Sequence, residues 1–297
     1  MVTTMTELLC CPVCLDSGFS GHTQAAENPL VFGQGSWCCS HGHQFDQARQ
    51  GYINVLPAQH KRSKDPGDSK AMVQARRRFL EQGFYQPLAD AIGRMLQCVA
   101  DPGAVLDAGC GEGYYLRQLA AKRPGLQLLG NDISKWAVRA AAPWHKTATY
   151  LVASNARIPL TSGSLDAIIC AFGFAVDNEF LRLLKPTGYL LKVDPASRHL
   201  NELRQVLYNN ARDAEAESTN SRAGWQLIES ERLCFSIALP TKDSIQDLVA
   251  MTPHQHKAGR DGLERLSALT SMTVTVDITL NLYQPDSTHS INEGAGL

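Results

Sequence analysis

The 297-residue sequence lacks an excess of charge of either sign, because 28 lysine and arginine residues stand against 29 aspartate and glutamate residues. This balance excludes a protein whose whole surface attracts nucleic acid, so a polyanion site would have to come from local clustering. A long apolar run is also missing: the longest, 167–176, contains Gly173 and is far short of a membrane span. Residues 1–9 contain no basic residue, which argues against a secretory signal and predicts a soluble, cytoplasmic protein.

A disulfide framework is a further absence. The nine cysteines are an odd number, and five of them fall within the first 39 residues. Such uneven placement predicts a reducing compartment and a different task for the N-terminal cysteines. Cys98, Cys170 and Cys234 are predicted to be core thiols, and Cys110 a small filler between glycines.

The N-terminal cysteines form two close pairs of metal ligands. Cys11 and Cys14 are separated by two residues, Cys39 and His43 by three, and 24 residues lie between the pairs. This spacing predicts a closed, structural zinc site that helps a short segment to fold. Which ligands complete the site stays open at this point, since four alternatives lie nearby: Cys10, Cys38, His41 and His22.

The composition divides the chain into four segments. Residues 1–56 are rich in Cys, Gly and His and are predicted to form the zinc-binding module. Residues 57–83 are predicted to be a basic linker and helix, residues 84–284 a large α/β domain, and residues 285–297 a disordered tail. Ser69 is the expected N-cap of the helix in the second segment.

The large domain has the pattern of a doubly wound, mostly parallel sheet. Helical stretches alternate with five apolar strands, predicted at 104–108, 127–132, 149–153, 165–172 and 189–193. Residues 274–282 alternate between apolar and polar side chains, which predicts a half-buried antiparallel strand at the sheet edge.

A glycine-rich loop follows the first of these strands. Gly109, Gly111 and Gly113 lie between the strand and a helix, Asp107 precedes them, and Asp132 ends the next strand. The spacing differs from the GxGxxG pattern of dinucleotide folds. The loop resembles motif I of class I S-adenosylmethionine (SAM) methyltransferases. That resemblance implies that the loop holds the methionine half of SAM, that Asp132 binds the ribose, and that Ser154 and Asn155 flank the adenine.

Positive charge clusters between residues 60 and 78. Seven lysines and arginines stand there against Asp65 and Asp68, a local net charge of +5. The segment is either a solvated linker and helix face or a strip that contacts RNA phosphates.

These features together resemble the RlmA family of bacterial 23S rRNA guanine-N1 methyltransferases. The resemblance rests on CPVC (11–14), HQFDQARQGYINVLP (43–57), QHKRSKDPGDS (59–69), QARRRFL (74–80), LDAGCGEGYY (106–115) and SRHL (197–200). It implies a seven-stranded class I methyltransferase domain, a homodimer, and methylation of guanine N1 in a 23S rRNA hairpin. Cys11, Cys14, Cys39 and His43 are then the zinc ligands, and the implied SAM contacts are Tyr85, Gly111, Glu112 and His199.

The sequence departs from the family pattern at 170–174, where it reads CAFGF instead of carrying a tyrosine and a proline, and at 185–188, where KPTG replaces KPGG. The first departure lies where a methyltransferase meets its target base. A sister activity on a neighbouring guanine is therefore an alternative, as are a small-molecule methyltransferase and an inactive zinc-ribbon RNA-binding protein.

No catalytic residue is assigned from the sequence. The chain lacks the [DNS]-P-P-[FYW] motif expected for exocyclic amino methylation. Candidates for a general base are His60, Asp65 and Asp68. Candidates for stacking on an extruded base are Phe172, Phe174 and Trp225.

Overall fold

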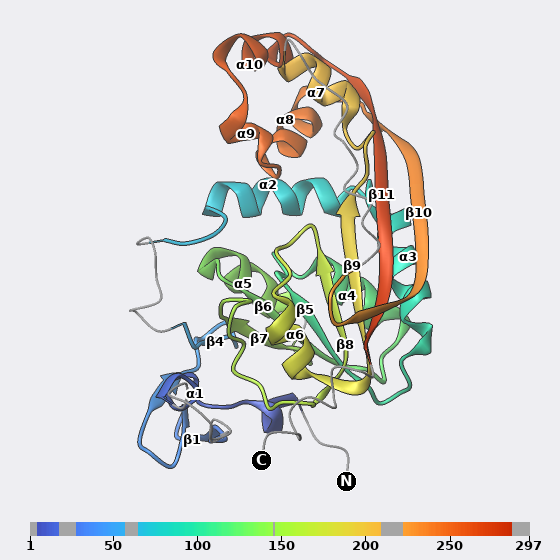
Figure 1. Cartoon of the computed structure of the whole chain (residues 1–297). Helices are drawn as coiled ribbons and strands as arrows, with labels where there is room; N and C mark the ends of the chain where they lie inside the picture. The colour runs from blue at the N-terminus through green and yellow to red at the C-terminus, as the bar shows by residue number, and fades with distance from the viewer. Residues whose placement is uncertain (1–4, 18–27, 57–64, 145, 209–221, 287–297) are drawn as a thin grey trace.

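The computed structural model describes residues 5–17, 28–56, 65–144, 146–208 and 222–286 (Figure 1). It contains a small three-stranded sheet near the N-terminus and an eight-stranded sheet that carries the helices. His22, His60 and nearly all of the expected tail, residues 287–297, lie outside the described residues.

The large sheet has the strand order β10-β11-β9-β8-β5-β6-β7-β4. All pairs from β4 to β9 are parallel, which confirms the doubly wound α/β fold. The strands span Ile53–Asn54 (β4), Ala104–Ala108 (β5), Gln127–Asp132 (β6), Thr149–Val152 (β7), Leu165–Ala171 (β8), Leu184–Pro195 (β9), Trp225–Leu239 (β10) and Met272–Pro285 (β11). The seven strands expected for the domain are present, and β4 adds an eighth by pairing with β7.

The antiparallel end of the sheet differs from the sequence prediction. The strand expected at 274–282 belongs to β11, which lies between β9 and β10 and is not at the edge. Its apolar residues from Val274 to Leu282 are buried in the main core, and α7 packs against this strand. The true edge strand, β10, was not predicted, since polar residues interrupt its apolar positions.

Helices cover the sheet and extend beyond it at one end (Figure 1). They span Pro12–Ser17 (α1), Lys70–Glu81 (α2), Gln86–Met95 (α3), Tyr114–Lys122 (α4), Lys135–Ala141 (α5), Asp177–Leu183 (α6), Asn201–Leu207 (α7), Lys242–Ala250 (α8), His254–Lys257 (α9) and Arg260–Ser267 (α10). Helix α2 begins where expected, because the Ser69 hydroxyl accepts the Met72 N–H at 3.3 Å. Within the described residues, no helix is long and apolar enough to span a membrane.

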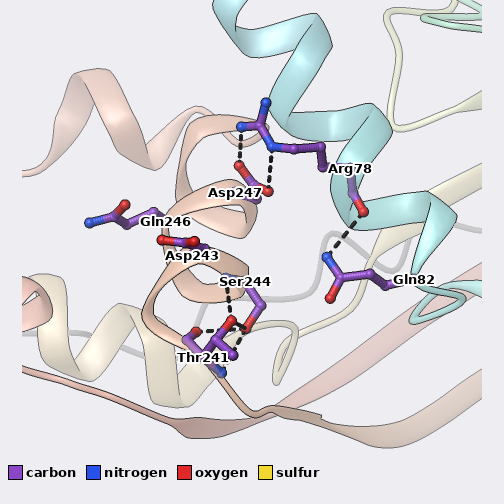
Figure 2. A pocket seen from close by; sticks show the side chains of 7 residues that line it. All are labelled: Arg78, Gln82, Thr241, Asp243, Ser244, Gln246 and Asp247. Atoms are coloured by element: carbon purple, nitrogen blue, oxygen red, sulfur yellow. Dashed lines mark hydrogen bonds and ion pairs between the residues drawn. The ribbon is translucent and has the colours of Figure 1, made fainter.

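A bidentate ion pair joins α2 to α8 (Figure 2). Arg78 donates Nε and Nη2 to the two carboxylate oxygens of Asp247, at 3.0 and 2.5 Å. A polar hollow of about 400 Å³ lies beside this pair, and none of the predicted cofactor residues lines it. We therefore interpret this ion pair as a structural link between α2 and α8 that lies outside the predicted cofactor site.

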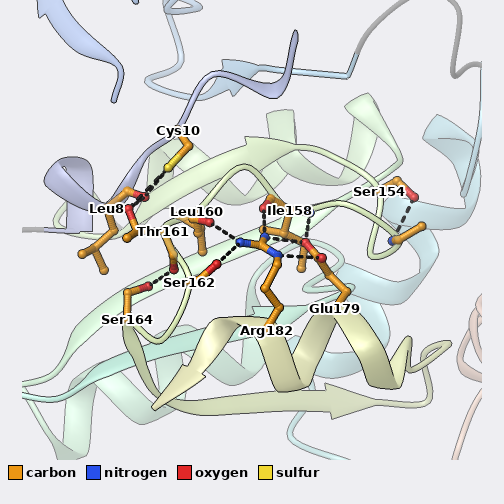
Figure 3. Close-up of polar contacts among 11 residues, drawn as sticks. Leu8, Cys10, Ser154, Ile158, Leu160, Thr161, Ser162, Ser164, Glu179 and Arg182 are labelled. Atoms are coloured by element: carbon orange, nitrogen blue, oxygen red, sulfur yellow. Dashed lines mark hydrogen bonds and ion pairs between the residues drawn. The ribbon is translucent and has the colours of Figure 1, made fainter. Parts of the chain in front are cut away.

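The N-terminal module is fastened to the large domain through residues 158–162 (Figure 3). Cys10 donates its N–H to Pro159 O at 2.9 Å, and Thr161 donates its N–H to Leu8 O at 2.9 Å. On the other side of this segment, Arg182 of α6 donates to Leu160 O and Ile158 O, both at 2.9 Å. The module is thus tied to the domain by backbone hydrogen bonds as well as by β4.

No disulfide joins any of the nine cysteines. Cys170 and Cys110 are buried, but the core positions predicted for Cys98 and Cys234 are wrong, because both residues are exposed. Cys98 ends a short 3₁₀ turn at the surface, Leu96–Cys98, in which Leu96 takes the buried place. Cys234 lies on the outward side of the edge strand β10.

Candidate functional site

The zinc-type ligands are presented by two tight local structures. Cys11 immediately precedes α1 and Cys14 lies on it. Cys39 and His43 flank a turn between β2 (Ser36–Cys38) and β3 (Gln44–Asp46), in which Cys39 donates its N–H to His43 O at 3.1 Å. Gly42 lies in this turn with φ +81° and donates its N–H to Cys39 O at 3.0 Å, so the turn needs a residue without a Cβ.

The four ligand atoms form a group of the right size for zinc. The Nδ1 atom of His43 lies 3.4 Å from each of the three Sγ atoms, and all four ligand atoms lie within 4.8 Å of one another. Tetrahedral zinc, with bonds of about 2.0–2.3 Å, separates its ligands by about 3.4–3.8 Å. The group is Cys11, Cys14, Cys39 and His43, and it leaves no open fourth position.

The three alternative ligands that the structure describes lie outside this four-atom group. Cys10 Sγ lies 3.3 Å from Thr161 Oγ1, on the side facing the large domain. His41 Nδ1 lies 3.3 Å from Cys14 Sγ but is only 2.8 Å from the Asn28 side-chain nitrogen. Cys38 is half-exposed at the end of β2. The arrangement therefore favours the predicted set.

The glycine loop is clamped to the neighbouring strand by its backbone. The N–H groups of Gly109 and Cys110 both point to Asn131 O, at 2.8 and 3.0 Å. The Gly111 N–H points to Asp132 Oδ2 at 3.0 Å, while Asp132 Oδ1 accepts the Ser134 N–H at 2.8 Å. Gly109 and Gly111 have φ of +88° and +56°, so the loop conformation requires glycine at these positions.

Three buried oxygens at the loop accept no hydrogen bond from the described residues: Asp107 Oδ2, Glu112 Oε1 and Asn131 Oδ1. Burial raises the pKa of Asp107 to about 8, with further contributions from the charges of Asp132 and Glu112. Burial also raises the pKa of Glu112 and of Asp132. Glu112 Oε1 lies 3.6 Å from Arg117 Nη2, an ion pair beyond hydrogen-bond distance. Buried acceptors without a hydrogen-bond donor are unstable unless a ligand satisfies them. SAM fits this site, because its ammonium group and ribose hydroxyls are donors.

Asn131 is a site residue that the sequence analysis missed. It is fully buried, and its side-chain nitrogen donates to Asn155 Oδ1 at 2.9 Å. The Asn155 amide in turn donates to Phe174 O at 3.1 Å. A polar residue at the carboxyl end of a buried parallel strand is the signal that could have found it. This chain of amides connects the glycine loop to the segment after β8.

Tyr85 and His199 are far apart in sequence, and the structure places both beside Phe172. The Phe172 ring stacks on His199 at 5.8 Å and contacts the edge of Tyr85 at 6.4 Å. Phe172 has φ +56°, a conformation uncommon for a large residue and frequent at functional sites. A Cβ on the next residue, Gly173, would lie 3.4 Å from Ala108 O, so this group adjoins the start of the glycine loop.

The end of the 59–69 motif packs against the residues that follow Asp132, between the end of β6 and the first turn of α5. A Cβ on Gly67 would lie 2.9 Å from the side chains of both Ile133 and Ser134. Ser134 donates its hydroxyl to Asp68 O at 2.6 Å, and Trp136 donates its indole N–H to Asp65 at 2.7 Å. Residues 65–68 thus lie beside the candidate cofactor site.

The arginines of α2 are engaged in ion pairs, which does not fit a continuous strip for RNA phosphates. Arg76 pairs with Asp68 at 2.8 Å, Arg77 with Glu81 at 3.0 Å, and Arg78 with Asp247. Lys70, at the start of α2, is exposed and lies over the Trp136 ring at 5.9 Å, and the three remaining candidates, in residues 60–64, lie outside the described part of the chain.

The three candidate stacking aromatics differ in exposure. Phe174 is 91% exposed and Phe172 is 42% exposed, both after the end of β8. Trp225 is only 7% exposed, packs on Tyr283, and donates its indole N–H to Asp177 at 2.9 Å. Trp225 is therefore a structural residue, and its predicted stacking role is wrong.

Two family models match the chain. A zinc-ribbon model described as "RlmA, N-terminal" matches residues 25–64. A second model, described as "Methyltransferase domain", matches residues 105–193, which include the glycine loop and β5 to β9. With the geometry above, these matches establish SAM as the cofactor and the Cys₃His cluster as a structural zinc site.

Curated relatives align over nearly the whole chain. A protein of Micromonospora griseorubida, provisionally named a 23S rRNA (guanine-N(1)-)-methyltransferase, is 32% identical over 93% of this chain and 96% of its own length. A protein of Bacillus subtilis (strain 168) with the same provisional activity is 31% identical over 91% and 94%. The 23S rRNA (guanine(748)-N(1))-methyltransferase of Streptomyces fradiae is 33% identical over 83% and 90%. Since these alignments span both parts of the molecule, the chain belongs to the RlmA family of 23S rRNA (guanine-N1)-methyltransferases.

Proposed function

We propose that the enzyme transfers the methyl group of SAM to N1 of one guanine in a hairpin of 23S rRNA. The observation that carries this proposal is the similarity, over 83–93% of the chain, to three proteins named 23S rRNA guanine-N1 methyltransferases, two of them provisionally. The preserved glycine loop, with Asp107 buried beneath it, supports an active enzyme over an inactive RNA-binding protein. We further propose that the enzyme works in the cytoplasm as a homodimer, the form that the family resemblance implies.

We propose specific residues for the two bound groups. The zinc ligands are the four members of the Cys₃His cluster. The proposed cofactor site consists of the glycine loop, the carboxyl end of β6 and the residues that contact Phe172. Its proposed members are Tyr85, Asp107, Gly109, Gly111, Glu112, Gly113, Asp132, Asn155 and His199.

The charge and position of two of these residues indicate which group of SAM each one binds. The buried Asp107 Oδ2, which accepts no hydrogen bond from the described residues, suits the ammonium group of SAM. Asp132 is oriented by two backbone N–H groups, which leaves further lone pairs for the ribose hydroxyls. When bound, SAM supplies an electrophilic methyl group on its sulfonium, so the protein mainly has to orient the two reactants.

The target guanine requires removal of its N1 proton before the nitrogen lone pair can react. His199 is not suited to accept this proton, because burial lowers its pKa to about 4. Its Nδ1 accepts the Asp277 N–H at 3.3 Å, which places the imidazole proton on Nε2. We propose that His199 is a hydrogen-bond donor in the site, suited to an oxygen of the bound molecules and not to base catalysis.

We propose Phe174 as the platform for the extruded guanine. Its ring is almost fully exposed, whereas its backbone is held by Asn155 near the glycine loop. Phe174→Ala should lower kcat/KM for RNA roughly 10- to 100-fold, because stacking of one base on an aromatic ring contributes about 1–3 kcal/mol. Steady-state kinetics with an rRNA hairpin would measure the loss, while SAM affinity should stay unchanged.

Ile228→Ala is the matched control for this substitution, since Ile228 is an exposed apolar residue on the edge strand β10. It should leave kcat/KM for RNA and the affinity for SAM unchanged. An unaltered kcat/KM in Phe174→Ala would contradict the stacking role.

The proposed reaction is tested with purified enzyme, labelled SAM and 23S rRNA from cells that lack the gene. After digestion to nucleosides, mass spectrometry should find the label in N1-methylguanosine. Label in another nucleoside would contradict the reaction, and a protein that methylates a small molecule but not RNA would support the small-molecule alternative.

A further inference from the structure

Arg76 of α2 lies directly over the glycine loop. A Cβ placed on Gly111 would be 3.1 Å from Arg76 Nη1 and 3.7 Å from Arg76 Cδ. The guanidinium therefore covers the part of the loop that the family resemblance gives to the methionine half of SAM. The predicted site did not include Arg76, because nothing in the local sequence distinguishes it from Arg77 and Arg78.

The guanidinium is held in this place by two contacts. Arg76 Nη2 lies 2.8 Å from Asp68 Oδ2 and donates to Met251 O at 3.2 Å. Both contacts use Nη2, whereas Nη1 is the atom that faces Gly111. A planar guanidinium fixed at one nitrogen can present its remaining N–H groups to a carboxylate.

A cation beside the glycine loop would balance the negative charge of the SAM carboxylate. The methionine half of SAM carries a carboxylate, but the groups buried around the loop are Asp107, Glu112 and the partly buried Asp132. On α4, Arg117 donates to Glu112 O at 2.7 Å and lies 3.6 Å from the Glu112 carboxylate. Arg117 is therefore engaged with Glu112, and among the described residues Arg76 is the cation that a Cβ on Gly111 would contact.

We infer that Arg76 binds the carboxylate of SAM, while Asp107 faces the ammonium group. The two charges of the amino acid end are then matched by an arginine from α2 and an aspartate from β5. Asp68 acts as a positioning residue that orients the guanidinium. The inference rests on SAM as cofactor and names a new contact for it.

The test compares SAM with decarboxylated SAM, which lacks only the carboxylate, by calorimetry on the full chain. Arg76→Ala should weaken SAM binding roughly 10- to 100-fold, the range for lost hydrogen bonds between charged groups. The affinity for decarboxylated SAM should change less than about twofold. Arg76→Lys, which keeps the charge, should fall between wild type and Arg76→Ala for SAM.

Arg78→Ala is the control for the position of α2, because it removes the ion pair to α8 without touching the loop. It should keep the SAM affinity, and thermal unfolding should show that each variant is folded. Equal losses for both ligands in Arg76→Ala, or a similar SAM loss in Arg78→Ala, would overturn the inference. Weaker RNA binding with unchanged SAM affinity would overturn it as well and would make Arg76 a phosphate contact. A wild-type chain that binds neither ligand would refute the cofactor itself.

Discussion

Cys14→Ser should release the zinc ion and unfold the N-terminal module. Zinc content, measured by elemental analysis of purified protein, should fall from about one ion per chain to less than about 0.2. The expected effect is large, because structural zinc contributes roughly 10–16 kcal/mol to the folding of small zinc modules. The module has a sheet of only three short strands, so it has little core of its own to replace the metal.

The variant should still bind SAM, because none of the four ligands belongs to the proposed cofactor site. Proteolysis should therefore cut within the first 56 residues and leave the large domain intact. Cys38→Ser is the matched control, since Cys38 adjoins a ligand but lies outside the four-atom group. Full zinc content in Cys14→Ser, or zinc loss in Cys38→Ser, would refute the ligand set.

Asp107→Asn should make the ligand-free protein more stable and a poorer binder of SAM. The pKa of the buried carboxyl is raised to about 8, so the folded state binds a proton that the unfolded state has released. Stability of the wild type therefore falls as pH rises from about 4 to 8. Asparagine does not titrate, so the variant should gain roughly 1–3 kcal/mol at pH 7.5, less than the full linkage value because its amide is also desolvated.

Thermal unfolding between pH 5 and 8.5 would measure this gain, which should widen with pH up to about 8 and then stay constant. Calorimetry should show SAM binding roughly 100-fold weaker, since the neutral amide cannot pair with the ammonium group. Asp166→Asn is a suitable control, because that carboxylate is more exposed and pairs with Lys185 at 2.8 Å. A variant that is less stable than wild type at pH 8, yet binds SAM normally, would be incompatible with the proposed role.

Local sequence patterns predict those parts of the structure whose geometry depends only on residues close together in the sequence. Cys39 and His43 share one turn, and the loop from Gly109 to Gly113 lies between a strand and the helix that follows it, so their spacing alone indicates their geometry. The five parallel strands were found for the same reason, because each is a short, buried apolar run.

Features that depend on distant partners were not predictable. Ile53 and Asn54 become a strand only because β7 offers a free edge, and β10 is a strand because it pairs with β11 along its length. Arg76 and Gly111 are 35 positions apart, and their approach depends on how α2 crosses the sheet. Trp225 is an aromatic residue of the kind that stacks on bases, and only its hydrogen bond to Asp177 in the folded chain shows that it is structural.

The proposed activity is tested most directly by mapping N1-methylguanine in 23S rRNA from cells with and without the gene. A methyl group on N1 blocks base pairing, so reverse transcription stops beside the modified guanine. We expect one stop within a single hairpin that disappears on deletion, returns with the wild-type gene, and stays absent with Asp107→Asn. The position of that stop also distinguishes the main family activity from the sister activity. An unchanged pattern of stops after deletion would contradict the proposed function.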